Sequence, residues 1–206
     1  MKLGRVHAFA LVFLLASCGG PAENSRASDD ALQRYAYRPT TPPEIRLLTV
    51  VSKRSGSGAH SALLISTQSE RILFDPAGSF ALPMVPERDD VLYGITPNTL
   101  ARYIDHHARE TYDLIEQRLA VSDKQARRIA AIAKSSGPVP RAQCALSIGR
   151  ILTQVDGFQS IKASYFPNAI RRQFAALSGV ETQVFQDDDA DRSEDGLTGK
   201  LALKRR

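Results

Sequence analysis

Tryptophan is absent from the chain, and cysteine occurs only twice, as Cys18 and Cys144. The formal net charge is +5, but there is no block of lysine and arginine interleaved with aromatic residues, so we expect no nucleic-acid partner. The acidic run 187–191 lacks the glycine-containing spacing of an EF-hand, which favours a solvated tail over a calcium site. Apart from these absences the composition is that of a globular protein, and 206 residues suit one domain with appendages.

The N-terminus has the pattern of a signal peptide. Lys2 and Arg5 precede an apolar run, residues 8–16, that is too short to span a bilayer permanently. The following residues 15–20, Leu-Ala-Ser-Cys-Gly-Gly, resemble a bacterial lipobox, which implies cleavage before Cys18 and a membrane partner reached through acyl chains on Cys18. Gly19 stands where an inner-membrane retention signal would have aspartate, so we expect the protein at the periplasmic face of the outer membrane. The alternative is an ordinary secretory signal with a chance cysteine.

These patterns divide the chain into four parts. We expect a lipoprotein signal peptide over 1–17, a flexible polar tether over 18–44, a folded domain over 45–186 and a disordered charged tail over 187–206. Lipidation of Cys18 would leave Cys144 without an intramolecular disulfide partner in an oxidising compartment. A lone thiol in such a place is either buried and inert or kept for chemistry.

Hydrophobic periodicity within 45–186 predicts an α+β fold, an antiparallel sheet packed by helices. Strands are predicted from residue 45 to 51, over 59–66, over 71–74, over 111–121 and over 180–185, and the second and third form a hairpin with a four-residue connection. Helices are predicted at 97–107 with Thr96 as cap, after the capping box Ser122-Asp123-Lys124-Gln125, from Cys144, and from Pro167. Residues 76–96 are predicted to be irregular.

Cys144 is the candidate nucleophile because of its place in the chain. It follows the break Gly137-Pro138-Val139-Pro140 and begins a helix whose buried face carries Ala145, Ile148, Gly149 and Leu152. A thiol in the first turn of a helix has a lowered pKa because it lies near the positive end of the helix dipole. A cysteine can also fill the same position as a small buried apolar residue.

His60 and Asp75 are the candidate partners of that thiol. A cysteine nucleophile needs a base within hydrogen-bond reach, and the base needs a third polar group that holds its tautomer. His60 begins the second predicted strand and Asp75 ends the third, so the hairpin places them on adjacent strands.

Three segments carry a resemblance to a known family: 58–65, 72–75 and 143–145, with 119–126 as the preceding strand-to-helix passage. Over about 45–186 the chain resembles the circularly permuted papain-like branch of the NlpC-type superfamily, which includes lecithin:retinol acyltransferase-like proteins. In that branch the histidine lies on an early strand, a polar residue on the next, and the cysteine on a later helix. This order is the reverse of that in ordinary papain-like hydrolases.

The resemblance implies a cysteine hydrolase or acyltransferase without a cofactor. Cys144 would attack an amide or ester carbonyl, His60 would transfer the proton, Asp75 would orient His60, and the backbone N–H of Cys144 with Gln143 would stabilise the oxyanion. For a lipid-anchored envelope protein, the expected substrates are peptidoglycan peptide bonds or acyl groups of lipids and lipoproteins.

Two other functions remain open. The first is a non-catalytic envelope lipoprotein that keeps the same fold, which is favoured because Gln143 and Ala145 stand where relatives often carry asparagine and a hydroxyl. The second is a solute- or metal-binding lipoprotein of unrelated fold, with Asp105, His106, His107 and His60 as candidate ligands. Consecutive histidines on a helix point about 100° apart, so a polar helix end is the preferred interpretation of His106 and His107, and no metal site is predicted.

Overall fold

A computed structural model describes residues 26–188 and 204–205 of the chain. The predicted signal peptide, Cys18 and most of the predicted tail lie outside these described residues, so those predictions are not tested by the structure. Within the described part, no helix is both long and apolar enough to cross a membrane.

One antiparallel sheet forms the centre of the fold, with the strand order β4-β5-β3-β2-β1-β6-β7-β8. The long central strands are β1 (Glu44–Ser52), β2 (Gly58–Ser66) and β6 (Tyr112–Ala120). The remaining strands are β3 (Arg71–Phe74), β4 (Glu87–Arg88), β5 (Val91–Leu92), β7 (Glu181–Gln186) and β8 (Lys204–Arg205). The predicted hairpin is confirmed, because β2 and β3 pair from Leu63 with Phe74 to Ser66 with Arg71.

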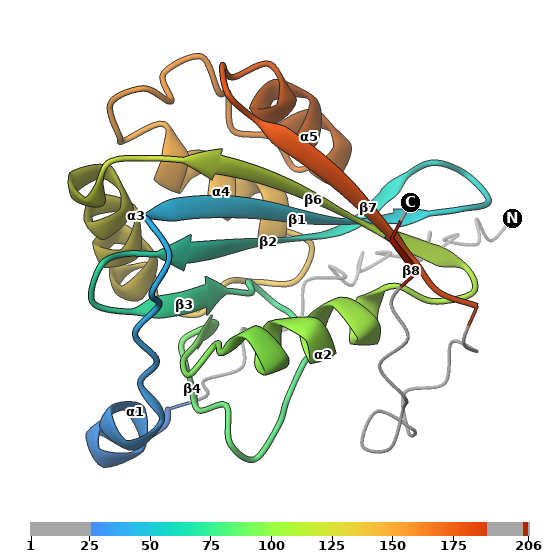
Figure 1. The fold of residues 1–206 in the computed structure, drawn as a ribbon. Helices are drawn as coiled ribbons and strands as arrows, with labels where there is room; N and C mark the ends of the chain where they lie inside the picture. Colours follow the sequence, from blue (N-terminus) through green and yellow to red (C-terminus); the bar gives the residue numbers. More distant parts are fainter. Residues whose placement is uncertain (1–25, 189–203, 206) are drawn as a thin grey trace, which may run out of the picture.

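Helices cover both faces of this sheet, which makes the fold α+β as predicted (Figure 1). The helices α3 (Asp123–Ser135), α4 (Cys144–Leu152) and α5 (Pro167–Ala175) pack on one face, and α2 (Pro97–His107) packs on the other. Two apolar clusters result: Ile45, Leu47, Leu63 and Ile65 face α3 to α5, whereas Leu48, Ala62 and Leu64 face α2. Because both faces are buried, the strands read as nearly continuous apolar runs.

Local sequence signals set the helix boundaries. Thr96 caps α2 by accepting a hydrogen bond from the Thr99 N–H, with Pro97 in the first turn. Ser122 and Gln125 form the predicted capping box of α3. In α4 the predicted stripe of Ala145, Ile148, Gly149 and Leu152 is buried. The helix ends at Leu152, and Val155 still contributes to the core beyond it.

The structure corrects two predictions of irregular chain. Residues 26–43, predicted as part of a flexible tether, contain helix α1 (Asp29–Tyr35) and are held against the domain: the Arg71 N–H donates to the Tyr37 carbonyl at 2.9 Å, and the Ala27 N–H donates to Glu87. The predicted loop 76–96 contains β4 and β5, which extend the sheet beyond β3. Both segments lack strong periodicity and acquire structure through backbone bonds to distant residues.

Candidate active site

His60 and Asp75 meet at the end of the sheet where β3 stops. The last β3 pair joins Phe74 to Leu63, so Asp75 lies just past the ladder and reaches diagonally to His60 on β2. The His60 Nε2 atom lies 2.7 Å from Asp75 Oδ1, and the Asp75 side chain is only 4% exposed. The predicted base and the predicted orienting carboxylate are therefore brought together.

Cys144 approaches the same place from the other face of the sheet. In the described part of the chain no strand pairs with 58–62 on the outer side of β2, because β3 is only four residues long. Helix α4 packs against β2, and the His60 ring and the Ser61 backbone N–H on β2 both act on the Cys144 thiol and lower its pKa. Since His60 Nε2 faces Asp75, Nδ1 is the ring nitrogen available to the thiol.

The electrostatics of this chain favour an imidazolium–thiolate pair. Burial lowers the pKa of His60, but the charge and hydrogen bond of Asp75, with a smaller contribution from Cys144, raise it to about 10. Burial raises the pKa of Cys144, but the hydrogen bond and charge of His60 and the backbone N–H groups of Ser61 and Ala145 outweigh it, so the thiol pKa is lowered. Both shifts move a proton from sulfur to nitrogen.

Two residues of α2 complete the buried end of this cluster. The Tyr103 hydroxyl donates to Asp75 Oδ1 at 2.8 Å, the same oxygen that faces His60. The His107 ring stacks on His60 with centroids 5.8 Å apart, and its Nδ1 lies 2.9 Å from the Tyr103 carbonyl. Burial lowers the pKa of His107 to about 4, so this second imidazole is neutral where His60 is charged.

Sequence reasoning missed Tyr103 and His107 as members of the site. The sequence analysis includes Tyr103 only within the predicted helix 97–107, and it interprets His107 as part of a polar helix end. The second prediction is correct for the His107 bond to a helix carbonyl, but the ring also contacts the site. The i,i+4 spacing of Tyr103 and His107 puts both side chains on the buried face of α2, and that spacing was the available signal.

Left-handed backbone conformations gather around the same segments. The non-glycine residues with positive φ in the described chain are Ala77, Asp89, Asp90 and Ala142. Ala77 lies two residues after Asp75, and Ala142 lies two residues before Cys144. Such conformations cost free energy in most residue types, and they concentrate at functional sites.

Asp90 joins the two segments that carry the acid and the nucleophile. Its backbone carbonyl accepts the Asp75 N–H at 2.8 Å, and its Oδ2 accepts the Val139 N–H at 2.6 Å, five residues before Cys144. Asp90 therefore fixes the turn that follows β3 relative to the segment that leads into α4.

Gly78 is required by the close packing of the Asp75 carboxylate. A Cβ atom at Gly78 would lie 2.0 Å from Asp75 Oδ2, so only glycine fits beside the acid. The Gly78 N–H also donates to the Asp75 carbonyl at 2.9 Å. The backbone of the turn after β3 therefore packs directly against the Asp75 carboxylate.

The other predicted site residues have the following positions. Gln143 is the half-buried N-cap residue of α4 and makes no side-chain cap hydrogen bond, and the Cys144 N–H belongs to the first turn, whose N–H groups have no intrahelical acceptor. His106 packs edge-on against Phe80, and Asp105 pairs with Arg109. Within the described residues, no group of three or more His, Cys, Asp or Glu side chains is arranged to hold a metal ion.

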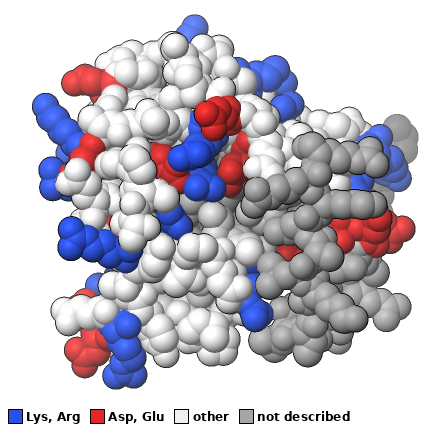
Figure 2. All heavy atoms as spheres, in the orientation of Figure 1, with Lys and Arg blue, Asp and Glu red and all other residues white. Residues whose placement is uncertain are grey.

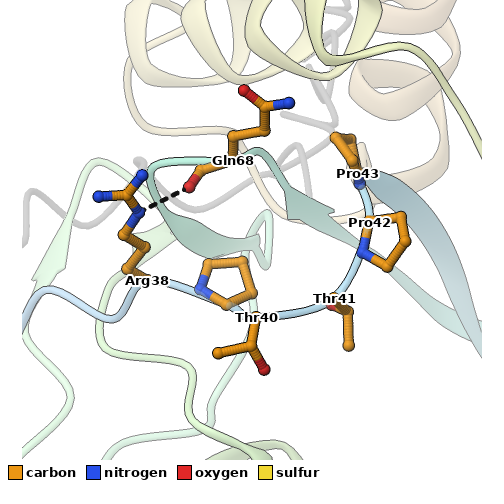
Figure 3. A pocket seen from close by; sticks show the side chains of 7 residues that line it. Arg38, Thr40, Thr41, Pro42, Pro43 and Gln68 are labelled. Carbon is orange, nitrogen blue, oxygen red and sulfur yellow. Dashed lines mark hydrogen bonds between the residues drawn. The ribbon is translucent and has the colours of Figure 1, made fainter.

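A surface pocket lies at the other end of the β2–β3 hairpin. It is lined by the segment 38–43 and Gln68, and Arg38 Nε donates to the Gln68 carbonyl at 2.9 Å (Figure 3). Three prolines and two threonines line most of it, and it contains no thiol, imidazole or carboxylate. The thiol, the imidazole and the carboxylate that could perform chemistry together lie at the opposite end of the hairpin.

Comparison of the chain with protein-family models, with curated proteins and with solved structures finds no match.

Proposed function

We propose that the protein is a lipid-anchored envelope cysteine hydrolase or acyltransferase of the circularly permuted papain-like type. The observation that carries this proposal is the His60–Asp75 hydrogen bond at 2.7 Å together with the mutual effect of His60 and Cys144, which lowers the thiol pKa and raises the imidazole pKa. The order of these residues, on β2, after β3 and at the start of α4, agrees with the resemblance read from the sequence. The lipid anchor would be attached at Cys18.

The reaction follows from these groups. The Cys144 thiolate attacks an amide or ester carbonyl carbon, and the carbonyl electron pair moves onto oxygen, where the Cys144 N–H and Gln143 would stabilise the negative charge. His60 gives its proton to the leaving amine or alkoxide as the bond to carbon breaks, which leaves an acyl thioester on Cys144. Water or an acceptor alcohol or amine, deprotonated by His60, then takes the acyl group and regenerates the thiolate.

Asp75 and its surroundings keep His60 in the productive orientation. Because Asp75 holds Nε2, Nδ1 faces the sulfur, and the buried carboxylate stabilises the imidazolium that the reaction needs. Tyr103 fixes the carboxylate in turn. The low exposure of this carboxylate strengthens its electrostatic effect on the ring.

A non-catalytic lipoprotein with the same fold is the second candidate. The observation that favours it is the burial of Cys144, which is only 7% exposed, so little of the thiol is accessible to a carbonyl carbon. The two candidates predict different thiol chemistry, because a scaffold has no need for a reactive sulfur.

The test is labelling of Cys144 by iodoacetamide across pH in the wild type, in His60→Ala and in the matched control His106→Ala. We expect the wild-type thiol to react well below pH 8.5, and His60→Ala to return its pKa toward the free value of about 8.5. His106→Ala should leave the profile unchanged, since His106 packs on Phe80 rather than on the thiol. A wild-type profile that matches His60→Ala would favour the scaffold.

A further inference from the structure

Two exposed aromatic side chains project just before α5. Phe166 is 72% exposed and Tyr165 is 57% exposed, the largest values among the large apolar side chains of the described chain. Exposing a phenylalanine to this extent forgoes the free energy of burying it. Adjacent exposed aromatic residues of this kind mark surfaces that bind a partner or a membrane.

Basic residues surround this aromatic pair, and the nearby Asp113 carboxylate is paired with Lys53 at 3.6 Å. Residues 162–172 carry Lys162, Arg171 and Arg172 without any acid, and the hairpin tip 53–57 carries Lys53 and Arg54 without any acid. Of these, Lys162, Arg172 and Arg54 are exposed. The two segments touch, because Asn168 Nδ2 donates to the Gly56 carbonyl at 2.7 Å.

The surface adjoins the candidate active site through Gly58. A Cβ atom on Gly58 would lie 2.6 Å from Pro167 Cβ, so β2 and the start of α5 are in direct contact. Phe166 immediately precedes Pro167, and His60 lies two residues after Gly58 on β2. A partner bound to the aromatic pair would therefore meet the end of β2 that also carries His60.

We propose that Arg54, Lys162, Tyr165, Phe166 and Arg172 form a membrane-docking surface that seats on an anionic lipid bilayer. Aromatic side chains settle at the headgroup level of membranes, and basic side chains are attracted to anionic headgroups. The combination suits a bilayer better than a glycan, which offers no apolar layer to an exposed phenylalanine. Resting on the proposed function, this places the thiol beside lipid, so the substrate class is acyl lipid rather than peptidoglycan peptide.

The absence of tryptophan allows a local test on the full chain. Phe166→Trp puts the chain's single indole on the membrane-docking surface, and Tyr35→Trp puts it on α1 instead, which precedes β1 in the chain. With vesicles of phosphatidylglycerol and phosphatidylethanolamine, we expect the indole emission of Phe166→Trp to move to shorter wavelength and to be quenched by lipids brominated in the acyl chain. The Tyr35→Trp control should show neither change.

The contribution of charge is tested in the Phe166→Trp background. Replacing Arg54 and Arg172 by glutamine should lower the docking equilibrium reported by the indole about 30-fold, because each basic residue near an anionic membrane surface contributes about 1 kcal/mol. An indole emission that stays unchanged while the Phe166→Trp protein is bound to vesicles would overturn the proposal. Retention on purified peptidoglycan without any lipid response would overturn it in favour of a glycan partner.

The two proposals can fail separately. The alkylation profile of Cys144 is measured without lipid. If the thiol is reactive but the indole of Phe166→Trp does not respond to vesicles, the proposed enzyme is supported and the membrane-docking surface is ruled out. If the thiol is inert but the indole is quenched, the docking surface is supported and the proposed enzyme is ruled out. Phe166→Trp is not expected to disturb folding, since the side chain is largely exposed.

Discussion

Two clusters of titratable side chains lie at opposite ends of one face of the sheet, the face that carries α2. At one end is the thiol cluster, made up of His60, Asp75, Tyr103, His107 and, reaching it from the edge of β2, Cys144. At the other end is an ion-pair cluster, made up of Glu44, Arg46, Glu116, Arg118 and Glu181. Figure 2, which views this face, shows acidic and basic side chains gathered together over the sheet.

The two clusters differ in what neutralises their buried carboxylates. In the ion-pair cluster Glu44 is bound by Arg46 at 2.6 Å and by Arg118, and a guanidinium does not lose its proton near neutral pH. In the thiol cluster Asp75 is bound by an imidazole and a phenol, and the pKa of the imidazole is also raised by the Cys144 thiol. The first cluster therefore has fixed charges, whereas protons can move within the second.

Removing the carboxylate at each end gives the largest expected effects. Asp75→Ala removes the buried partner of His60 and the acceptor of the Tyr103 hydroxyl, and it should lower the free energy of unfolding by about 3–5 kcal/mol in urea titrations. Glu44→Ala should lower it by less, because Arg46 keeps Glu116 and Arg118 keeps Glu181. Only Asp75→Ala should also raise the thiol pKa in an alkylation profile, because His60 loses the charge that keeps it protonated.

If either alanine variant does not fold, Asp75→Asn and Glu44→Gln test the same difference with hydrogen-bond acceptors retained. Asp75→Asn should slow alkylation of Cys144 at pH 7 by about 10- to 100-fold, since an opposite charge shifts a neighbouring pKa by about one to three units. Equal effects of the two variants on the thiol would mean that the clusters are not chemically distinct.

His107 should make the protein sensitive to acid. Its folded pKa of about 4 lies below the unfolded value of about 6.5, so the unfolded chain binds a proton first as the pH falls. His107 should therefore lower the free energy of unfolding progressively as the pH falls below 6.5, by about 3 kcal/mol near pH 4. His60 contributes no slope there, because its pKa is raised and it is protonated in both states below pH 6.5.

The measurement is urea unfolding at pH 7 and pH 4.5 for wild type and His107→Gln. The variant should lose less stability on acidification than the wild type does. His106→Gln is the control for a neighbouring imidazole, whose pKa burial and Arg109 also lower. A wild type and a His107→Gln variant with the same pH dependence would show that His107 is not held neutral.

Tyr103→Phe should give the smallest effect. It deletes only the hydroxyl that donates to Asp75 Oδ1, and hydrogen bonds to charged groups contribute about 1.5–3 kcal/mol. We expect a loss of about 2 kcal/mol in the free energy of unfolding and a change of less than about tenfold in thiol alkylation, because His60 still holds the carboxylate. Tyr35→Phe, on α1, is the control. An alkylation rate as low as that of Asp75→Asn would mean that Tyr103, rather than His60, sets the position of the acid.

The elements predicted correctly are those with strong local signals. Thr96 and Pro97 mark the start of α2, Ser122 and Gln125 mark α3, and two short apolar runs around the polar break 67–70 mark the β2–β3 hairpin. The proximity of His60 and Asp75 could be predicted from the sequence because the pairing register of a hairpin is short-range. Helix α1, β4 and β5 were missed, since α1 is a short helix, β4 and β5 have two residues each, and β5 joins the sheet by pairing with β3.

The membership of the thiol cluster was only partly accessible from the chain. A lone thiol at a helix start is evident in the sequence, but nothing local says that α2 presses Tyr103 and His107 against Asp75 from the opposite face. The link from Asp90 to Val139 is equally hidden, because it spans 49 residues of sequence. These contacts depend on how the turns after β3 and before α4 are strained and packed.

By itself the sequence determined the α+β class, the hairpin that carries His60 and Asp75, and the helix that begins with Cys144, because periodicity and caps act over a few residues. Only the tertiary structure decided that the short β3 leaves the edge of β2 open to the sulfur, and that a buried tyrosine and a neutral histidine support the acid. The physical reason is that packing of helices on both faces of a sheet is settled by summed burial over the whole domain, not by any single segment.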